Sequence, residues 1–326
     1  MEKKDSVCVT GGTGYLGSWL VMKLHNHGYY VNTTIRTNSP SGIRYICYNN
    51  RFEFIGEMTK LPGASDRLQI FHADLDEPQS FNAAIEGCIG VFHAAHPLDF
   101  QDEESEEVKL IKRTANGLLG ILQSCLDSKT VRRVVLTSST SAIVWNSENL
   151  NEMDENTWTD VDFVRRSKLY GSSYIITNTL IKKAASEFAE KHALALVSVV
   201  PSWIHGAFIT PSCHVSVAVH MALLFGNKEH CSFLQRTSFV HIDDVVSAHI
   251  FLFEKQEAKG RYICSSVEIT IDKLSKFLSA RYPDYQIPIF DGISSKKLLD
   301  AGFNFKYGLE EIYDDAIECC KQKGFL

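Results

Sequence analysis

Hydrophobic and polar positions alternate between two kinds of segment along the first two thirds of the chain. Short apolar runs, several of them rich in β-branched residues, are typical of buried strands and occur at residues 6–10, 30–35, 68–71, 90–93, 131–137 and 194–200. Segments with apolar residues at helical spacing lie at residues 15–27, 103–126 and 174–191. Because strands that alternate with helices indicate βαβ units, we predict an α/β fold with a doubly wound parallel sheet.

The pattern changes after Pro201. Shorter helical segments are predicted at residues 215–225, 243–254, 271–280 and 309–320, mixed with brief apolar runs. Residues 37–66 show no clear period and contain Pro and Gly, which predicts mostly loop. A further helix is expected to begin near Pro78, with Asp76 as its capping residue. We therefore expect residues 201–326 to form mostly a smaller lobe, with some strands and helices returning to the main sheet.

Composition narrows the class of protein. The chain has 326 residues, of which 44% are hydrophobic and 22% are charged, an ordinary balance for a globular protein. Its net charge is −6 and it has no basic stripe, so a nucleic-acid partner is not expected. No apolar run is long enough to cross a membrane, and the first residues lead directly into a strand without room for a leader. The nine cysteines include no CxxC pair, so we expect reduced thiols, no metal site and a cytoplasmic protein.

A glycine-rich turn joins the first predicted strand to the first predicted helix. Residues 10–17 read TGGTGYLG, with glycines three positions apart. In such a turn the first glycine suits the tight bend, the second lets the backbone approach a pyrophosphate, and the third lets helix and strand pack closely. The helix N-terminus then offers N–H groups to the phosphates. This context predicts a dinucleotide site of the Rossmann type in residues 1–200, contacted by Gly11, Thr13, Gly14, Tyr15, Leu16 and Gly17.

The residues after the next strands indicate which dinucleotide is bound. Arg36 follows the second strand, where an NAD site usually carries an acidic residue, and a cation there accommodates a 2′-phosphate. The sequence therefore predicts NADP(H), with Arg44 as a second cation, although a solvated surface arginine is the plain alternative. Four residues after later strands are also expected near the cofactor: Asp74, Leu75, Ala94 and Ala95.

Hydroxyl side chains follow the predicted strand at residues 131–137. Ligands collect at the carboxyl edge of such a sheet, and Ser139 lies there. Tyr174 lies in the next long helical segment. A serine that orients a carbonyl and a tyrosine that donates a proton are a working pair for carbonyl reduction. A lysine four residues after the tyrosine would complete this motif, but Asn178 stands there.

Further motifs extend the pattern over nearly the whole chain. They include residues 9–20, 73–75, 91–95, 137–139, 154–158, 239–244, 260–266 and 303–307. In this order they resemble the extended short-chain dehydrogenases/reductases of the plant dihydroflavonol 4-reductase type, and most closely the vestitone reductase and noscapine synthase branches. The resemblance implies a flavonoid-like or alkaloid-like aromatic substrate from plant specialised metabolism. Residues 45–60 and a short segment at 287–293 depart from the family, and we expect them to reshape the substrate lobe.

The resemblance also implies roles by position. The family's catalytic serine and tyrosine fall on Ser139 and Tyr174, and its lysine falls on Asn178. Its 2′-phosphate arginine falls on Arg36, and its proline near the nicotinamide falls on Pro201. Ser216 is a further residue expected at the cofactor.

Asn178 divides the functional hypotheses. A nearby ammonium lowers the pKa of a tyrosine, so without one Tyr174 should stay protonated at neutral pH and still donate a hydrogen bond. Lys182 and Lys183 lie two turns along the helix and do not fit as substitutes, whereas Lys168 or a histidine remains open. The first hypothesis is an NADPH-dependent carbonyl reductase with a weakened proton relay. The second is a non-redox cyclase, isomerase or dehydratase that keeps NADP(H), and the third is an inactive binding protein.

The substrate pocket is the least defined part of the prediction. Aromatic and apolar residues after the catalytic segments suit an aromatic ligand, although core packing is an equally ordinary explanation. We expect a monomer or a weak homodimer. The pocket residues are expected to be His96, Val144, Tyr170, Trp203 and His205.

Overall fold

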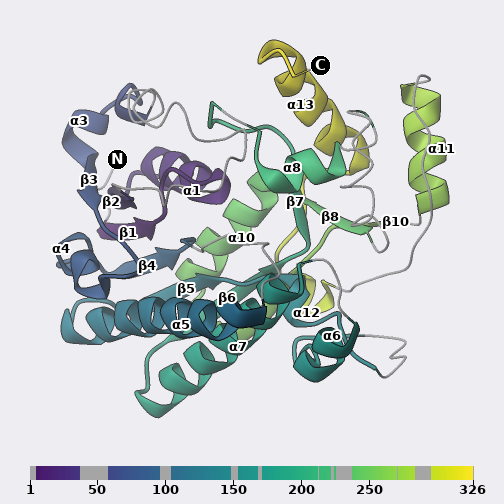
Figure 1. The fold of residues 1–326 in the computed structure, drawn as a ribbon. Coiled ribbons are helices and arrows are strands. Elements are labelled where there is room, and N and C mark those ends of the chain that lie inside the picture. The colour runs from purple at the N-terminus through teal and green to yellow at the C-terminus, as the bar shows by residue number, and fades with distance from the viewer. Residues whose placement is uncertain are drawn as a thin grey trace.

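A seven-stranded sheet, parallel throughout, forms the centre of the protein in the computed structural model (Figure 1). The structure describes residues 5–36, 58–95, 104–147, 153–167, 171–211, 213–221, 224, 237–269, 271–282 and 295–325. The strand order is β3-β2-β1-β4-β5-β6-β9, whose first six strands follow the order of a Rossmann sheet. The strands are β1 (Ser6–Thr10), β2 (Tyr30–Ile35), β3 (Leu68–His72), β4 (Gly90–His93), β5 (Arg133–Thr137), β6 (Leu196–Pro201) and β9 (Gly260–Cys264). The predicted fold is confirmed.

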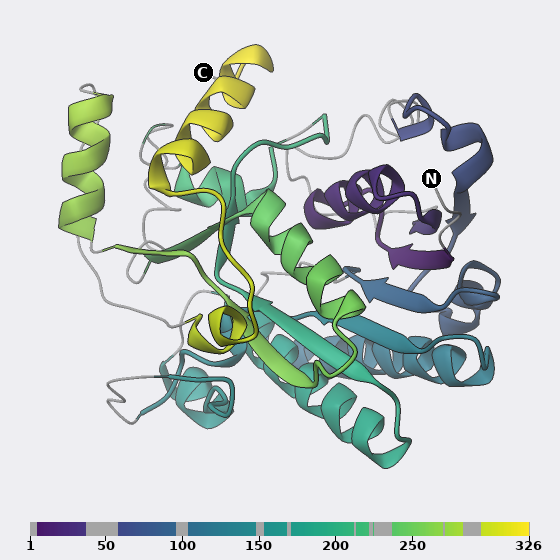
Figure 2. The same ribbon diagram turned by 180° about the vertical axis from the view of Figure 1, so that it is seen from behind.

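Helices cover both faces of this sheet (Figures 1 and 2). One face packs against α1 (Tyr15–Asn26) and α10 (Ile242–Glu254), and the other against α5 (Glu104–Asp127) and α7 (Ser172–Lys191). Successive residues of β1 serve the two faces, since Val7 and Val9 belong to the first core and Cys8 to the second. Burial on both faces explains why the central strands β1, β4 and β5 read as nearly continuous apolar runs.

The smaller lobe is built around a three-stranded sheet in the order β10-β8-β7. Its strands are β7 (Trp203–His205), β8 (Thr237–His241) and β10 (Val267–Ile269), and its helices are α8 (Val215–His220), α11 (Ile271–Arg281) and α13 (Leu309–Gln322). Helix α11 lies at the outer edge of the lobe (Figure 1). Although they follow residue 200 in the chain, α10 and β9 belong to the main sheet and its cover. The boundary at residue 200 therefore stays a prediction.

Short elements complete the described chain. They are α3 (Ala64–Arg67), η1 (Pro78–Phe81), α4 (Asn82–Ile85), η2 (Thr140–Ala142), α6 (Val161–Ser167) and α12 (Lys296–Asp300). The helical segment near Pro78 begins where it was predicted, but Asp76 does not cap it. Glu77 occupies the capping position without a side-chain hydrogen bond, and the Asp76 carboxylate instead forms a salt bridge with Arg113 of α5. An ion pair with a neighbouring helix has replaced the local cap.

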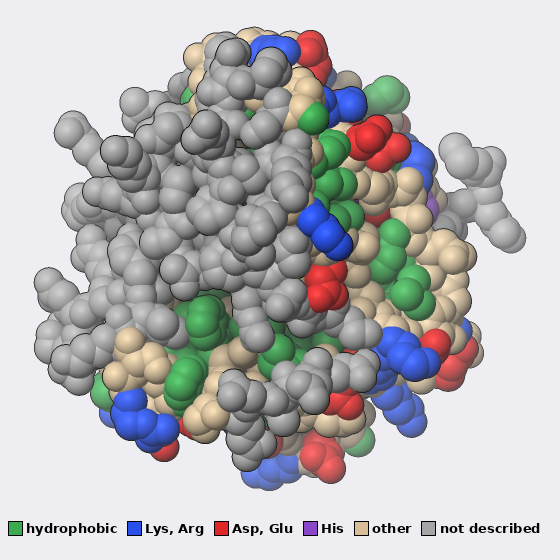
Figure 3. All heavy atoms as spheres, turned by 90° about the vertical axis from the view of Figure 1, so that its right-hand side faces the viewer, with side chains coloured by type: hydrophobic (Ala, Val, Ile, Leu, Met, Phe, Trp, Pro, Cys, Tyr) green, Lys and Arg blue, Asp and Glu red, His purple; other side chains and the backbone are tan. Residues whose placement is uncertain are grey.

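None of the described helices has the length and apolar character needed to span a bilayer. Basic and acidic side chains are interspersed on the face shown in Figure 3. Within the described ranges, no group of three or more His, Cys, Asp or Glu side chains is arranged to hold a metal ion.

Candidate functional site

The glycine loop between β1 and α1 leaves little room for side chains. Gly11 has a φ of +74°, and a Cβ on it would lie 3.0 Å from the Ala95 Cα atom. A Cβ on Gly17 would lie 2.1 Å from the Gly11 carbonyl oxygen, so this glycine allows α1 to approach the loop. The Ala95 N–H donates to Thr10 Oγ1 at 3.2 Å, and the Gly11 N–H donates to Thr34 Oγ1 at 3.2 Å. Contacts from β2 and β4 therefore hold the loop closely.

The start of α1 is suited to an anion. Gly14 is exposed, caps the helix without a side-chain hydrogen bond, and is followed by a first turn that contains no acidic residue. The N–H groups and the positive end of the helix dipole at this point favour a phosphate. Tyr15 and Leu16 are buried, and the Tyr15 hydroxyl donates to the Gly206 carbonyl at 3.2 Å. Tyr15 and Leu16 would therefore contact a phosphate only through their backbone N–H groups, and half-buried Thr13 lies beside them. This arrangement fits the pyrophosphate of a dinucleotide.

The residues predicted to hold the adenosine end lie at the same edge of the sheet. Arg36 directly follows β2, and its Nε lies 3.4 Å from Asp74 Oδ2. Both side chains are about one quarter to one third exposed, with values of 25% and 32%. Leu75 instead packs into the core formed with α5, so only its backbone is available to a ligand. Arg44 lies outside the described residues.

The predicted residues of the nicotinamide end come from three elements. Ala94 and Ala95 follow β4, with Ala95 against Gly11. Pro201 ends β6 and pairs with Cys264 of β9. Ser216 lies in the first turn of α8, and the capping residue His214 stacks on Tyr15 with ring centroids 5.2 Å apart. The start of α8 therefore lies beside the glycine loop.

Four polar side chains meet where β5 ends and α7 begins. The Tyr174 hydroxyl is hydrogen-bonded to the hydroxyls of Ser139 and Ser141. The Ser141 N–H donates to Ser139 Oγ at 3.1 Å, and Asn178 Nδ2 donates to Ser141 Oγ at 3.0 Å. The structure thus brings the predicted Ser139, Tyr174 and Asn178 together. Ser141 was missed, although it belongs to the hydroxyl run that follows β5.

The electrostatics of Tyr174 follow from this environment. Burial raises its pKa above the ordinary value of 10.0, and hydrogen bonds from Ser139 and Ser141 lower it by a smaller amount. No ammonium of the described residues contributes to the shift. The phenol is therefore protonated at neutral pH, as expected for a site with Asn178 in place of a lysine.

A buried lysine lies one helical turn beyond Asn178. Lys182 is only 3% exposed, and burial lowers its pKa to about 7. The pKa of His93 is lowered to about 3, mainly by burial and in addition by the nearby charge of Lys182. His93 ends β4, and its Nδ1 is hydrogen-bonded to Thr10 Oγ1 at 2.9 Å. The charge of Lys182 is therefore felt at the ends of β4 and β1, next to the glycine loop. It is absent from the groups that shift Tyr174, and sequence reasoning gave no signal for its burial.

Three of the predicted substrate-pocket residues lie within the described structure. His205 is fully buried in an aromatic cluster of the small lobe, with its ring centroid 4.8 Å from that of Tyr313, so it is a core residue. Half-buried Trp203 packs against His220, with ring centroids 4.8 Å apart. Val144 packs at the edge of a small core near Val200. The remaining predicted residues lie outside the described ones: His96, Lys168 and Tyr170.

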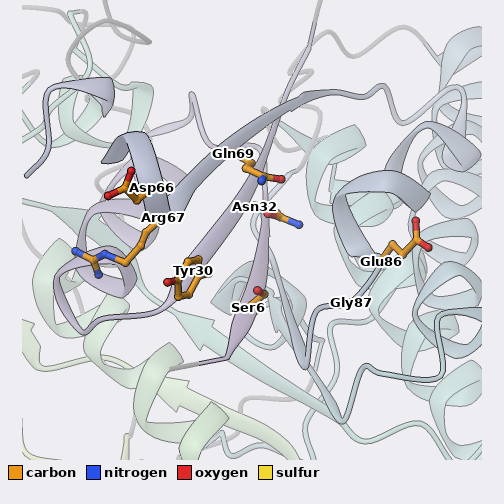
Figure 4. Close-up of a pocket in the computed structure, with 8 residues that line it drawn as sticks. All are labelled: Ser6, Tyr30, Asn32, Asp66, Arg67, Gln69, Glu86 and Gly87. Atoms are coloured by element: carbon orange, nitrogen blue, oxygen red, sulfur yellow. The ribbon is translucent and has the colours of Figure 1, made fainter. Parts of the chain in front are cut away.

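Two polar hollows are lined by residues other than those of the hydroxyl cluster. The one in Figure 4 has a volume of about 210 Å³ and includes Ser6 and Tyr30, the first residues of β1 and β2, so it opens at the opposite edge of the sheet. The other, about 420 Å³, includes Asp154 and Trp158 of the 154–158 motif. The Arg261 guanidinium lies 3.6 Å from the centre of the Trp158 ring, which gives this motif a packing role between β9 and the loop before α6.

Comparison with known proteins places the chain in a family. Residues 7–264 match the model of the NAD dependent epimerase/dehydratase family. Vestitone reductase from Medicago sativa is 45% identical over 336 residues, which cover 100% of this chain and 99% of that protein. Dihydroflavonol 4-reductase from Arabidopsis thaliana is 43% identical over 336 residues, covering 100% and 85%. Noscapine synthase SDR1 from Papaver somniferum is also 43% identical over 336 residues, covering 98% and 93%.

The fold agrees with these matches. The crystal structure of vestitone reductase from alfalfa (Medicago sativa) aligns with a TM-score of 0.84 at 42% identity, covering 99% of this chain and 100% of that one. The resemblance drawn from the sequence motifs is therefore confirmed. The chain belongs to the NAD dependent epimerase/dehydratase family, the extended short-chain dehydrogenases/reductases.

Proposed function

We propose that this protein is an NADPH-dependent carbonyl reductase that acts on an aromatic plant metabolite. The observation that carries the proposal is the cluster of Ser139, Ser141 and Tyr174 hydroxyls at the carboxyl edge of the sheet. The edge also holds a glycine loop that fits a dinucleotide, and relatives with 45% and 43% identity are named reductases. Arg36 supports NADPH over NADH because it places a cation where a 2′-phosphate would lie.

The side chains divide the work of carbonyl reduction. NADPH, when bound, supplies the hydride. Ser139 Oγ orients the carbonyl oxygen, and Tyr174 Oη donates the proton to it. The raised pKa of Tyr174 keeps that proton in place but makes the phenolate that remains after transfer less stable. Ser139 and Ser141 stabilise this phenolate through hydrogen bonds, and the Asn178 amide holds Ser141 in position. Reduction is therefore slow, and the reverse reaction, which needs the phenolate as a base, is slower.

A second candidate function rests on Asn178. Its amide is directed to Ser141 and adds no charge to the cluster, so the site is equipped to hydrogen-bond a carbonyl or phenol without promoting hydride transfer. A non-redox cyclisation, isomerisation or dehydration would use the same hydroxyls, with NADP(H) bound as a scaffold. A binding protein without activity ranks third, because the glycine loop and the hydroxyl cluster are both intact.

Replacement of Tyr174 by Phe tests the proposed site. We expect reduction of aromatic ketones such as vestitone and dihydroflavonols to fall by about 10²-fold or more, because the proton donor is lost. The measurement is NADPH oxidation together with product analysis by mass spectrometry. Tyr30→Phe, at the opposite edge of the sheet, is the matched control and should keep full activity.

The outcomes separate the three functions. Product that forms in the wild type without a change in nicotinamide absorbance supports the non-redox reaction. Failure to bind NADPH in a titration leaves only the inactive binding protein. If Tyr174→Phe keeps every activity of the wild type, the hydroxyl cluster is not the active site.

Arg36 provides a prediction for the cofactor. The Arg36→Ala variant should bind NADPH about 10- to 100-fold more weakly and bind NADH almost unchanged, since one charged hydrogen-bond partner of the 2′-phosphate is removed. Titration of protein fluorescence with each cofactor measures both affinities. Arg132→Ala, an exposed arginine before β5, is the control and should change neither. An equal loss for both cofactors would show that Arg36 only supports the loop.

A further inference from the structure

Two cysteines that are distant in the sequence meet in the small lobe. Cys213 lies just before α8, and Cys320 lies near the end of α13. Both are free thiols and are hydrogen-bonded to each other. The neighbouring Cys319 makes a different contact, donating to the Phe208 carbonyl at 3.6 Å. Cys319 and Cys320 therefore connect the end of α13 to Phe208 and Cys213. Of these two contacts in the described structure, only that of Cys320 is with another thiol.

The pair differs chemically from the cysteines of the main core. Burial raises the pKa of Cys8, Cys88 and Cys125, which suppresses their thiolates. The hydrogen bond with Cys213 instead lowers the pKa of Cys320. The thiolate is the species that attacks an oxidised sulfur, and the contact with Cys213 favours the thiolate of Cys320, whereas burial disfavours it at Cys8, Cys88 and Cys125. Cys213 is 8% exposed, whereas Cys320 is fully buried, so an oxidant reaches Cys213 first.

We propose that Cys213 and Cys320 form a reversible disulfide, with hydrogen peroxide as the oxidant. Peroxide converts the Cys213 thiol to a sulfenic acid and releases one water. The Cys320 thiolate then attacks the Cys213 sulfur, the S–S bond forms, and the hydroxyl group leaves as a second water after taking up a proton. Two thiols are oxidised and one peroxide is reduced. A dithiol such as dithiothreitol reverses the reaction by exchange.

The position of the pair connects this modification to the cofactor loop. His214 follows Cys213 and stacks on Tyr15, the first residue of α1. The Tyr15 hydroxyl also donates to the Gly206 carbonyl in the same segment. A disulfide would therefore fix the segment that contacts the start of α1 onto helix α13. We expect the oxidised protein to release NADPH more slowly, a consequence that rests on the proposed cofactor, whereas formation of the disulfide does not.

The experiment treats the full-length protein with hydrogen peroxide, blocks the remaining thiols with iodoacetamide and maps the unreduced peptides by mass spectrometry. Cys319 and Cys320 are adjacent, so the Cys319→Ser variant locates the bond. We expect a peptide linked through Cys213 and Cys320 in the wild type and in Cys319→Ser, and its loss after dithiothreitol. Cys8, Cys88 and Cys125 serve as internal controls and should stay unlinked. The oxidised protein should melt about 5 °C higher, because the bond closes a long loop.

Variants of each partner make the proposal falsifiable. Cys213→Ser and Cys320→Ala should each abolish the linked peptide and the rise in melting temperature, and Cys213→Ser retains the fully buried Cys320 in case the second variant folds poorly. NADPH dissociation, followed by stopped flow, should slow about 3- to 10-fold on oxidation of the wild type only. A bond that involves Cys319, or no linked peptide under peroxide, overturns the disulfide. An unchanged dissociation rate with the bond present overturns only its link to the cofactor.

Discussion

Replacing Asn178 with Lys should raise the rate of NADPH-dependent ketone reduction by roughly 10²-fold, because an ammonium beside Tyr174 favours the phenolate produced by proton transfer. In the wild type the pKa of Tyr174 lies above its ordinary value, and the hydroxyls of Ser139 and Ser141 are the groups that oppose this shift. Steady-state kinetics with NADPH and vestitone measure the effect. The gain should appear in kcat, since Asn178 contacts Ser141 in the site and not the glycine loop.

The positive charge of Lys182 should reduce the gain in rate that Asn178→Lys produces. It lies four residues after position 178 on the buried side of α7, where a second ammonium is opposed by burial and by like charge. The double variant Asn178→Lys, Lys182→Met should therefore exceed the single variant in rate. Lys182→Met alone is the matched control and should leave the rate close to that of the wild type, since Lys182 does not shift Tyr174.

The dependence of the rate on pH distinguishes electrostatic gain from a general improvement. Reduction needs protonated Tyr174, and burial raises the pKa of this phenol, so the wild-type rate should hold beyond the ordinary tyrosine pKa of 10.0 before it falls. In the Asn178→Lys variants the fall should begin at lower pH, because the pKa of Tyr174 is lower. If these variants fold, bind NADPH and reduce no faster than the wild type, the missing lysine is not what limits the reaction.

Acidification below about pH 6 should destabilise the protein sharply. Burial lowers the pKa of His93 to about 3 and those of His214, His220 and His249 to about 4, and it lowers that of His205 well below the ordinary 6.5. Well above the ordinary histidine pKa of 6.5 these side chains are neutral in both folded and unfolded states, so their contribution to stability is fully present. As the pH falls from 6.5 toward 4, the unfolded chain binds protons that the folded chain cannot. The free energy of unfolding then falls by about 1 kcal/mol per histidine per pH unit.

Five such histidines produce a loss comparable to the whole stability of a domain, which is about 5–15 kcal/mol. Urea unfolding at pH 7.5, 6.5 and 5.5 measures the slope. His205→Phe tests its origin, because neither ring nitrogen of His205 has a hydrogen-bond partner among the described residues. This variant should reduce the slope by close to one proton without loss of stability at pH 7.5. The exposed His192→Gln variant should leave the slope unchanged, and an equal slope in both variants would refute the assignment to buried histidines.

The main sheet was predictable because most of its strands have a clear apolar or β-branched pattern in the sequence. Burial on both faces makes β1 and β4 nearly continuous apolar runs, and β2 is rich in β-branched residues. The predicted bounds of these three strands agree with the structure. The small lobe was less readable. Strand β7 has only three residues, and its core contains His205 and His220, which read as polar positions in a sequence. Aromatic packing, not periodicity, places these histidines inside, and burial keeps their rings uncharged.

The candidate site divides in the same way. The glycine loop follows from its motif, because close packing leaves no room for side chains at Gly11 and Gly17. The pair of Ser139 and Tyr174 follows from hydroxyls at the carboxyl end of a predicted strand and a tyrosine in the next long helical segment. The position of Ser141 between Tyr174 and Asn178 could not be predicted from the sequence, since it depends on how η2 turns after β5. The burial of Lys182 depends on which side of α7 meets the sheet. Helical periodicity alone predicted only that Lys182 lies off the helix face that carries Tyr174.

The order of strands has a consequence for synthesis of the chain. Strand β6 ends at Pro201, but its outer neighbour β9 begins only at Gly260. At about 5–20 residues per second, the ribosome takes about 3–12 s to make the intervening segment. During that time β6 presents an unpaired apolar edge to other nascent chains. A chaperone that holds the chain until residue 264 emerges should therefore raise the soluble yield more than any change to the finished surface.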